Sequence, residues 1–160
     1  MNVNSYGTIE ISGISDNFPP YSNTFKQFHL QKILCVPNTK PNIHQILHAN
    51  VNTKICNKYS ISSSKAFSHE GQILKECNLV IHGIVLLKIE YVSCEIDHSV
   101  HAAEFKIPFS NYIVMNKCIT YNSKILVSSY IEDVFIEQIN KRKLFANILL
   151  LINSNYCKNN

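Results

Sequence analysis

The 160-residue sequence has no tryptophan, only four glycines and few charged residues, which make up 16% of the chain. So few glycines leave little material for a phosphate-cradling loop, and no GxSxG sequence marks a serine nucleophile. The longest apolar run, residues 144–152, is interrupted by an asparagine and is about half the length that spans a bilayer. The first residues lack the positive segment and apolar core of a secretory signal. We therefore expect a cytoplasmic protein without a membrane partner.

Positive charge is weak and spread along the chain. The formal net charge is +4, and the one basic run comprises Lys141, Arg142 and Lys143. Nucleic-acid-binding surfaces concentrate basic side chains and interleave them with aromatic ones. This distribution therefore argues against a nucleic-acid partner.

The six cysteines are dispersed and include no CxxC pair. That spacing does not match a zinc knuckle, and without a signal peptide a secreted disulfide framework is not expected either. Two interpretations remain open. The cysteines are either free, partly buried thiols, or some are exposed and cross-link neighbouring subunits in an oxidising environment. The candidate cross-linking residues are Cys35, Cys56, Cys77, Cys94, Cys118 and Cys157.

Other chemistry-bearing residues form no complete site. His44 and His48 would share one face of a helix, but the glutamate of an HExxH motif is missing. Cys94, His98 and His101 are close in sequence, yet a turn separates the cysteine from two histidines that point to opposite faces of a strand. We predict no catalytic, cofactor or metal site and no enzyme activity. A Cys/His enzyme would instead reveal itself by one hyper-reactive cysteine.

A strict alternation of apolar and polar residues marks two strands within residues 79–109. Such a period of two, with one apolar face, is typical of a half-buried β-strand. The polar residues 94–99 predict the turn between them. Antiparallel pairing would place Lys88 and Glu90 near Glu104 and Lys106 on the solvent face. The residues predicted to face the core are Val85, Leu87, Ile89, Tyr91, Ala103, Phe105, Ile107 and Phe109.

Similar patterns predict strands over residues 25–36, 51–61, 112–120, 125–139 and 144–152. The parity of residues 125–139 shifts at Glu132 and Asp133, which a β-bulge would explain. Apolar residues on both faces of residues 144–152 predict a central strand. Pro41 followed by Ile43 and Ile46 predicts a short helix near residues 41–47. The predicted fold class is all-β, mainly antiparallel: a β-sandwich or open barrel with that one helix.

The termini are predicted to be distinct from the central domain, residues 25–152. Residues 1–24 read as an N-terminal arm, in which Ile9, Ile11 and Ile14 punctuate a polar segment. This arm could be disordered, or could add a strand to its own sheet or to a neighbour's. Residues 153–160 read as a polar tail.

Five stretches, in order, resemble the signature of the SPOCS domain family. They are KPNIHQIL (40–47, family KPDIEQI), a glycine followed by KIEYV (83 and 88–92), SVHAA (99–103), IPFS (107–110), and YIEDV with KR and FANI (130–134, 141–142 and 145–148). Asn42 replaces the usual aspartate, and His44 replaces the usual glutamate. The signature positions are Lys40, Pro41, Ile43, Ile46, Gly83, Tyr91, Val100, His101, Pro108, Phe109, Ile131, Glu132, Asp133 and Arg142.

The resemblance implies a clostridial sporulation protein that acts in spore-coat assembly. Some family members also carry a C-terminal LysM module that recruits the basement layer of the coat. We expect no such module here and do not carry that role over. The expected location is the mother-cell cytoplasm during sporulation and then the spore surface, as part of the coat, exosporium or an appendage.

The expected function is that of a structural protein that self-associates through β-strand edges, with itself and other coat proteins as partners. The alternative is a monomeric adaptor that binds one spore-coat partner.

Overall fold

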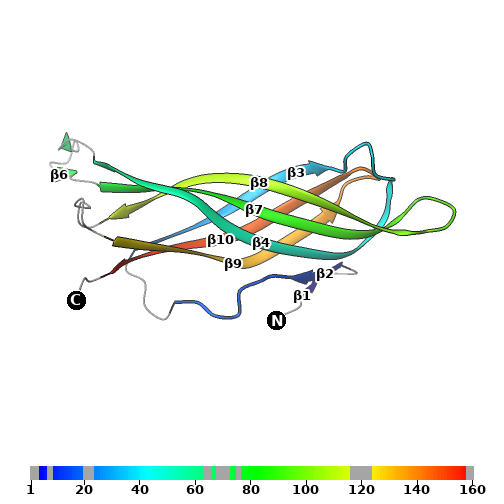
Figure 1. The fold of residues 1–160 in the computed structure, drawn as a ribbon, viewed down its shortest axis with the longest axis horizontal. Coiled ribbons are helices and arrows are strands. Elements are labelled where there is room, and N and C mark those ends of the chain that lie inside the picture. Colours follow the sequence, from blue (N-terminus) through cyan, green and yellow to red (C-terminus); the bar gives the residue numbers. More distant parts are fainter. Residues whose placement is uncertain are drawn as a thin grey trace.

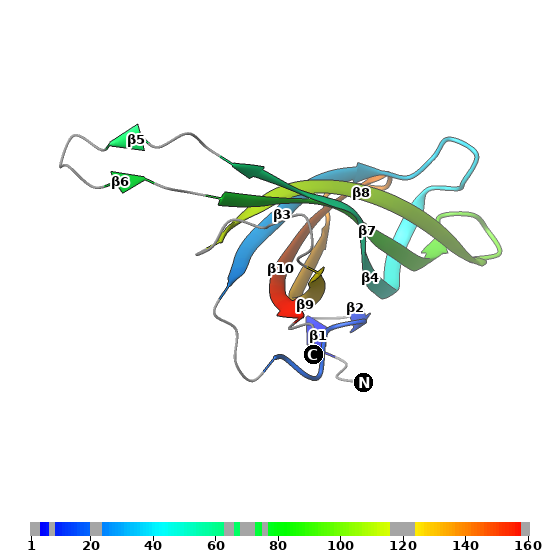
Figure 2. The ribbon, with the colours of Figure 1, turned by 60° about the vertical axis from the view of Figure 1, so that its left-hand side comes forward.

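Two β-sheets packed face to face make up the computed structural model, which describes residues 4–6, 9–19, 24–62, 66–67, 73–74, 77–115 and 124–157 (Figure 1). The larger sheet has the strand order β1 (Asn4–Tyr6), β2 (Ile9–Ser12), β4 (Ile43–Ser62), β7 (Cys77–Ser93), β8 (Val100–Met115). The smaller sheet has the order β3 (Phe25–Cys35), β10 (Lys143–Cys157), β9 (Lys124–Gln138). Figure 2 shows β4 and β7 leading toward a separate pair, β5 (Ala66–Phe67) and β6 (Ile73–Leu74).

The sheets approach each other along two seams without closing into a barrel. On one side β3 lies near β8, and on the other β9 lies near β4. Within the described ranges, no hydrogen-bonded ladder joins the two sheets along either seam. The predicted all-β fold is therefore confirmed as an open sandwich.

The β7–β8 hairpin forms as its alternation predicts. Buried and accessible residues alternate along all of β7, and the predicted inward residues of β7 lie in the core. The turn falls between Ser93 and Val100, as expected. Lys88 lies opposite Glu104, which confirms one predicted charge pair, whereas Lys106 lies opposite Leu86.

The predicted helix near residues 41–47 is wrong, because β4 begins at Ile43. The pairing of β4 with β7 shifts between Ile43 and Gln45 and again between Ile46 and His48. Each bulge inserts one extra residue, so apolar side chains three apart both face the core. Ile43 and Ile46 are indeed buried. Two bulges in a strand thus imitate the apolar spacing of a helix.

The predicted bulge in β9 is confirmed. Asp133 pairs with Leu149 and Ile131 with Leu150, so Glu132 is the extra residue. The prediction of a central strand is also confirmed, since β10 lies between β3 and β9. This strand continues to Cys157, and Asn153 and Ser154 beyond its predicted end are buried.

Gly83 leaves room for an aromatic contact between the two sheets. It lies opposite Phe109, whose ring covers it: a Cβ built on Gly83 would be 2.3 Å from Phe109 Cζ and 2.9 Å from Lys54 O. A cross-strand aromatic ring over a strand glycine is a known stabilising arrangement. The same ring contacts Phe28 of β3, with 5.6 Å between ring centroids. The glycine therefore makes room for the ring that bridges the sheets.

Replacing that glycine is expected to destabilise the fold. Gly83→Ala would displace the Phe109 ring and is expected to lower the free energy of unfolding by about 2–3 kcal/mol, as measured by urea denaturation. The double variant Gly83→Ala/Phe109→Leu is expected to lose less than the sum of the two single variants, because the smaller side chain leaves space for the methyl group. Strictly additive losses would contradict this account.

Candidate functional site

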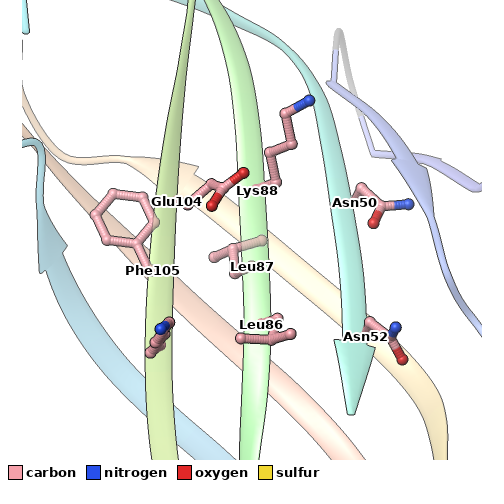
Figure 3. A pocket seen from close by; sticks show the side chains of 8 residues that line it. Asn50, Asn52, Leu86, Leu87, Lys88, Glu104 and Phe105 are labelled. Atoms are coloured by element: carbon pink, nitrogen blue, oxygen red, sulfur yellow. The ribbon is translucent and has the colours of Figure 1, made fainter. Parts of the chain in front are cut away.

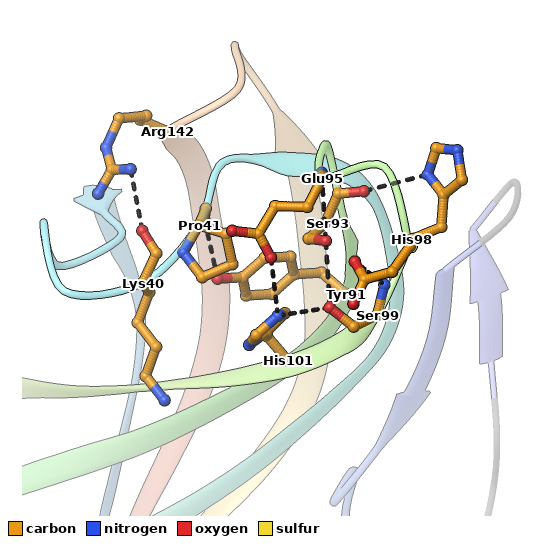
Figure 4. A network of polar contacts seen from close by, with 10 residues as sticks. Lys40, Pro41, Tyr91, Ser93, Glu95, His98, Ser99, His101 and Arg142 are labelled. Carbon is orange, nitrogen blue, oxygen red and sulfur yellow. Dashed lines mark hydrogen bonds and ion pairs between the residues drawn. The ribbon is translucent and has the colours of Figure 1, made fainter.

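Several of the signature residues, among them Lys40, Pro41, Tyr91 and Arg142, gather at one end of the sandwich, where three connections meet (Figure 4). Arg142, in the β9–β10 turn, reaches across the β3–β4 loop. Its Nη2 donates to the carbonyl oxygens of Val36 at 2.8 Å and Pro37 at 2.7 Å. Its Nη1 donates to the carbonyl oxygen of Lys40 at 3.2 Å and to Asn42 Oδ1 at 3.0 Å. One guanidinium thus fixes a whole loop, because its planar fork presents several donors at once.

Residues of the β7–β8 hairpin hold the same loop from the other side. The Tyr91 hydroxyl donates to the carbonyl oxygen of Pro41 at 3.0 Å. The Cys94 backbone N–H donates to the Asn42 carbonyl at 2.9 Å, and its thiol donates to the Ile43 carbonyl at 3.3 Å. The loop is therefore tied to both neighbouring turns. We call these contacts of Arg142, Tyr91 and Cys94 with the β3–β4 loop the loop lock.

The loop lock is intact although position 42 departs from the family pattern. Asn42 Oδ1 accepts the Arg142 hydrogen bond that the family's aspartate would accept as a charged group. His44, the second departure, is exposed, and its ring lies 5.6 Å from that of His98. The chain therefore retains the geometry of the signature while losing one negative charge at the lock.

Burial changes the pKa of one residue of the loop lock, Tyr91. Burial raises the pKa of the Tyr91 hydroxyl above its ordinary value of about 10; Glu95 adds to the rise, and Arg142 opposes it. The native state therefore binds this proton more tightly than the unfolded state does. The resulting stabilisation is fully present below pH 10 and is lost as the pH rises through the raised pKa.

Tyr91→Phe tests this hydrogen bond. The variant keeps the ring but loses the donor to Pro41, so the free energy of unfolding is expected to fall by about 1 kcal/mol at neutral pH. Above pH 10 the difference between the wild type and the variant is expected to shrink, because burial raises the pKa of the Tyr91 hydroxyl and so disfavours the ionised form in the fold. Chemical denaturation of the wild type and the variant at pH 7 and pH 11 measures the difference in their free energies of unfolding at each pH. Parallel pH profiles for the two proteins would refute the role of the hydroxyl.

A Ser–His–Glu group beside the lock lacks relay geometry. His101 Nε2 lies 2.9 Å from Ser99 Oγ and 3.8 Å from Glu95 Oε2, so both partners address the same ring nitrogen. A catalytic triad uses opposite nitrogens of the imidazole, one toward the nucleophile and one toward the acid. This group therefore holds the β7–β8 turn rather than activating Ser99.

The histidines and Cys94 considered as metal ligands do not converge. His48 Nε2 lies 2.9 Å from Ser12 Oγ, whereas His98 Nδ1 contacts the Ser93 carbonyl oxygen at 3.3 Å. Within the described part of the chain, no group of three histidine, cysteine, aspartate or glutamate side chains could hold a metal ion.

The remaining signature positions lie apart from the lock. Val100 and Pro108 lie in β8, and Val100 is exposed. Ile131, Glu132 and Asp133 form the bulge of β9, where Glu132 accepts a hydrogen bond from Gln27 at 2.6 Å.

A shallow hollow of about 220 Å³ lies on the outer face of the larger sheet (Figure 3). Its side chains are spread along β4, β7 and β8 and do not point toward one centre. The lining residues are Asn50, Asn52, Leu86, Leu87, Lys88, Glu104, Phe105 and Lys106. Mixed charges without convergence give no basis for a small-molecule site.

In the part of the chain that the structure describes, β8 is hydrogen-bonded to β7 alone, and β3 lies near its other edge without a ladder. Pro108 fits an edge strand because it has no N–H to donate. Tyr112, of the same parity, donates its N–H to Asn111 Oδ1 at 2.9 Å and so points this N–H away from β7. Tyr112 and Val114 are 48% and 47% exposed. This edge offers both unpaired backbone groups and apolar side chains.

Asparagines cap open-edge donors at two further positions. Asn52 Oδ1 accepts the N–H of Thr53 at 2.7 Å, and Asn57 Oδ1 accepts the N–H of Lys58 at 2.8 Å. Both lie on β4 beyond its short ladder with β2. We call Asn52, Asn57 and Asn111 the edge asparagines. Nothing in their sequence context distinguishes them in a chain rich in asparagine, so sequence reasoning missed them.

The cysteines differ in their accessibility. Cys35, Cys56 and Cys94 are exposed and free, whereas Cys77 is 3% exposed and lies in the core. Cys118 lies outside the described residues, and of Cys157 only the backbone is described. Among the cysteines whose side chains are described, the accessible candidates for cross-links are therefore Cys35, Cys56 and Cys94.

The fold and the loop lock define an all-β sandwich domain whose signature residues hold loops and sheets in place. A family model described as "SipL, SPOCS domain" matches residues 42–139, and the chain belongs to this family. Family membership gives it a sporulation-related role. Searches of curated proteins and of solved structures each returned no match. Among the described residues no helix has the length and hydropathy of a membrane span.

Proposed function

We propose that this protein is a structural component of the spore surface that self-associates by pairing strands at its open sheet edges. The observation that carries the proposal is the outer edge of β8 from Val100 to Met115, for which no strand among the described residues provides a second hydrogen-bonded partner. An exposed edge is a template for another strand, and the exposed Tyr112 and Val114 would be covered by such pairing. The role requires no reaction, cofactor, membrane or nucleic acid.

The proposed route is synthesis in the mother cell, followed by deposition on the coat, exosporium or an appendage. Exposed Cys35, Cys56 and Cys94 would then cross-link neighbouring copies, two thiols losing two electrons and two protons to molecular oxygen as each disulfide forms, since surface thiols oxidise more readily than buried ones. Immunogold labelling of sporulating cells tests the location: label around the outside of the forespore supports the proposal, and label within the forespore contradicts it. Extraction of spores with and without reductant tests the cross-links, and identical migration would exclude them.

The second candidate is a monomeric adaptor that accepts a strand from one spore-coat protein. The edge asparagines favour it over a polymer, because they cap donors on both β4 and β8 and so disfavour pairing at two edges, which a polymer needs, whereas an adaptor needs pairing at only one. The two candidates differ in the mass of the purified protein. A monomer at every concentration that captures one coat protein would favour the adaptor.

A further inference from the structure

Residues 9–15 of the N-terminal arm fill the seam between β4 and β9. β2 pairs in parallel with β4, with Glu10 opposite His48 and Ser12 opposite Asn50. The chain then crosses to β9, where the Ser15 N–H donates to the Ile131 carbonyl at 2.8 Å and the Ile131 N–H donates to Ser15 Oγ at 3.0 Å. Figure 2 shows β2 beside the two sheets. One segment therefore bridges both sheets at this seam.

Three consecutive arm residues, Ile11, Ser12 and Gly13, fit the seam closely. Ile11 is 0% exposed. Ser12 Oγ accepts a hydrogen bond from Asn50 Nδ2 at 2.8 Å and contacts His48 Nε2 at 2.9 Å. Gly13 has a φ of +100°, and a Cβ there would lie 1.8 Å from the Val51 carbonyl oxygen. An apolar anchor, a matched hydroxyl and an obligatory glycine make this a specific strand-binding site.

The occupant is joined to the rest of the chain only through residues 16–24. Nine extended residues span at most about 30 Å, enough to reach a copy held alongside. An arm in a neighbour's seam would make the same contacts as in its own, so exchange changes little besides the path of the linker.

We propose that the seam between β4 and β9 also accepts residues 9–15 of a second copy of this chain. This exchange rests on the proposed function, because copies held at sheet edges raise the effective concentration of each arm near its neighbour's seam. Each copy both gives an arm and receives one. If the arms pass from copy to copy in one direction, the assembly grows as an open filament.

Cross-linking in a mixture of two full-length variants tests the exchange. Ser12→Cys chains are mixed with isotopically heavy Asn50→Cys chains, incubated under assembly conditions and then oxidised. Mass spectrometry measures heavy–light peptides linked between positions 12 and 50, which the native cysteines cannot mimic. We expect at least tenfold more of this link than in a control mixture of Ser12→Cys with heavy Lys54→Cys.

The double variant Ser12→Cys/Asn50→Cys must form the link and so verifies the geometry. If the substitution of the buried Ser12 loosens the arm, Glu10→Cys with His48→Cys offers a second register pair with a more exposed arm residue. Linking in the double variants but none in either mixture, while the wild type polymerises, would overturn the exchange and leave the proposed function standing. A wild type that stays monomeric, together with no mixed link between the variant chains, would overturn both.

Discussion

Arg142→Ala is expected to lower the free energy of unfolding by about 3 kcal/mol, the largest loss expected from any side chain of the loop lock. The guanidinium donates to the carbonyls of Val36, Pro37 and Lys40 and to the side chain of Asn42. Charge-assisted hydrogen bonds are individually stronger than neutral ones, and removing the donor leaves several acceptors without it. For a chain of this size the melting temperature should fall by roughly 6–12 °C.

Two matched variants separate geometry from charge. Arg142→Lys keeps the charge but cannot present a fork, so it is expected to recover less than half of the loss. Lys141→Ala removes a charge from the same turn but keeps the backbone carbonyl that accepts the Ile43 N–H at 2.7 Å, so it should change stability by less than 0.5 kcal/mol. Equal losses for Arg142→Ala and Lys141→Ala would refute the loop lock.

Tyr112→Pro is expected to abolish strand pairing at the β8 edge without unfolding the protein. It removes the N–H that points away from β7, as Pro108 already does at the same parity. It also removes a ring that lies 5.5 Å from Lys26 Nζ, a contact worth about 0.5–1 kcal/mol. Negative-stain microscopy should show polymers of the wild type and at least a tenfold loss of them in the variant.

Two other substitutions at this edge, Tyr112→Ala and Asn111→Ala, are expected to preserve or strengthen assembly. Tyr112→Ala also lacks the ring but keeps the N–H, so its polymers should persist. Asn111→Ala removes the amide that caps this N–H, so it should assemble at a severalfold lower protein concentration. If Tyr112→Ala and Tyr112→Pro lose assembly equally, the ring rather than the backbone edge makes the contact.

Sequence reasoning succeeded where one periodicity was uninterrupted. β7 and β8 alternate without a bulge between them, so the inward residues and the turn could be predicted. It failed at residues 41–47, because two bulges in β4 gave apolar residues a helical spacing. The family signature included Arg142 and Tyr91 but not the bonds that they make, because Arg142 bonds to backbone carbonyls about a hundred positions away.

The sequence indicated that the arm forms a strand but not which strand it pairs with. Ile9, Ile11 and Ile14 indicated a strand that could join its own sheet or a neighbour's, and the structure shows it in its own sheet. A three-residue parallel ladder carries too little pattern for its partner strand to be read from sequence. The shape of the seam at Val51 and Ile131 is a property of the folded chain alone.

The mass of the purified wild-type protein as a function of its concentration tests the central claim most directly. Sedimentation or light scattering under reducing conditions is expected to show species that grow well beyond the 18.3 kDa chain as the concentration rises. Edge pairing between copies requires this growth without disulfide bonds. A single 18.3 kDa species at every concentration would contradict the account and leave the adaptor in its place.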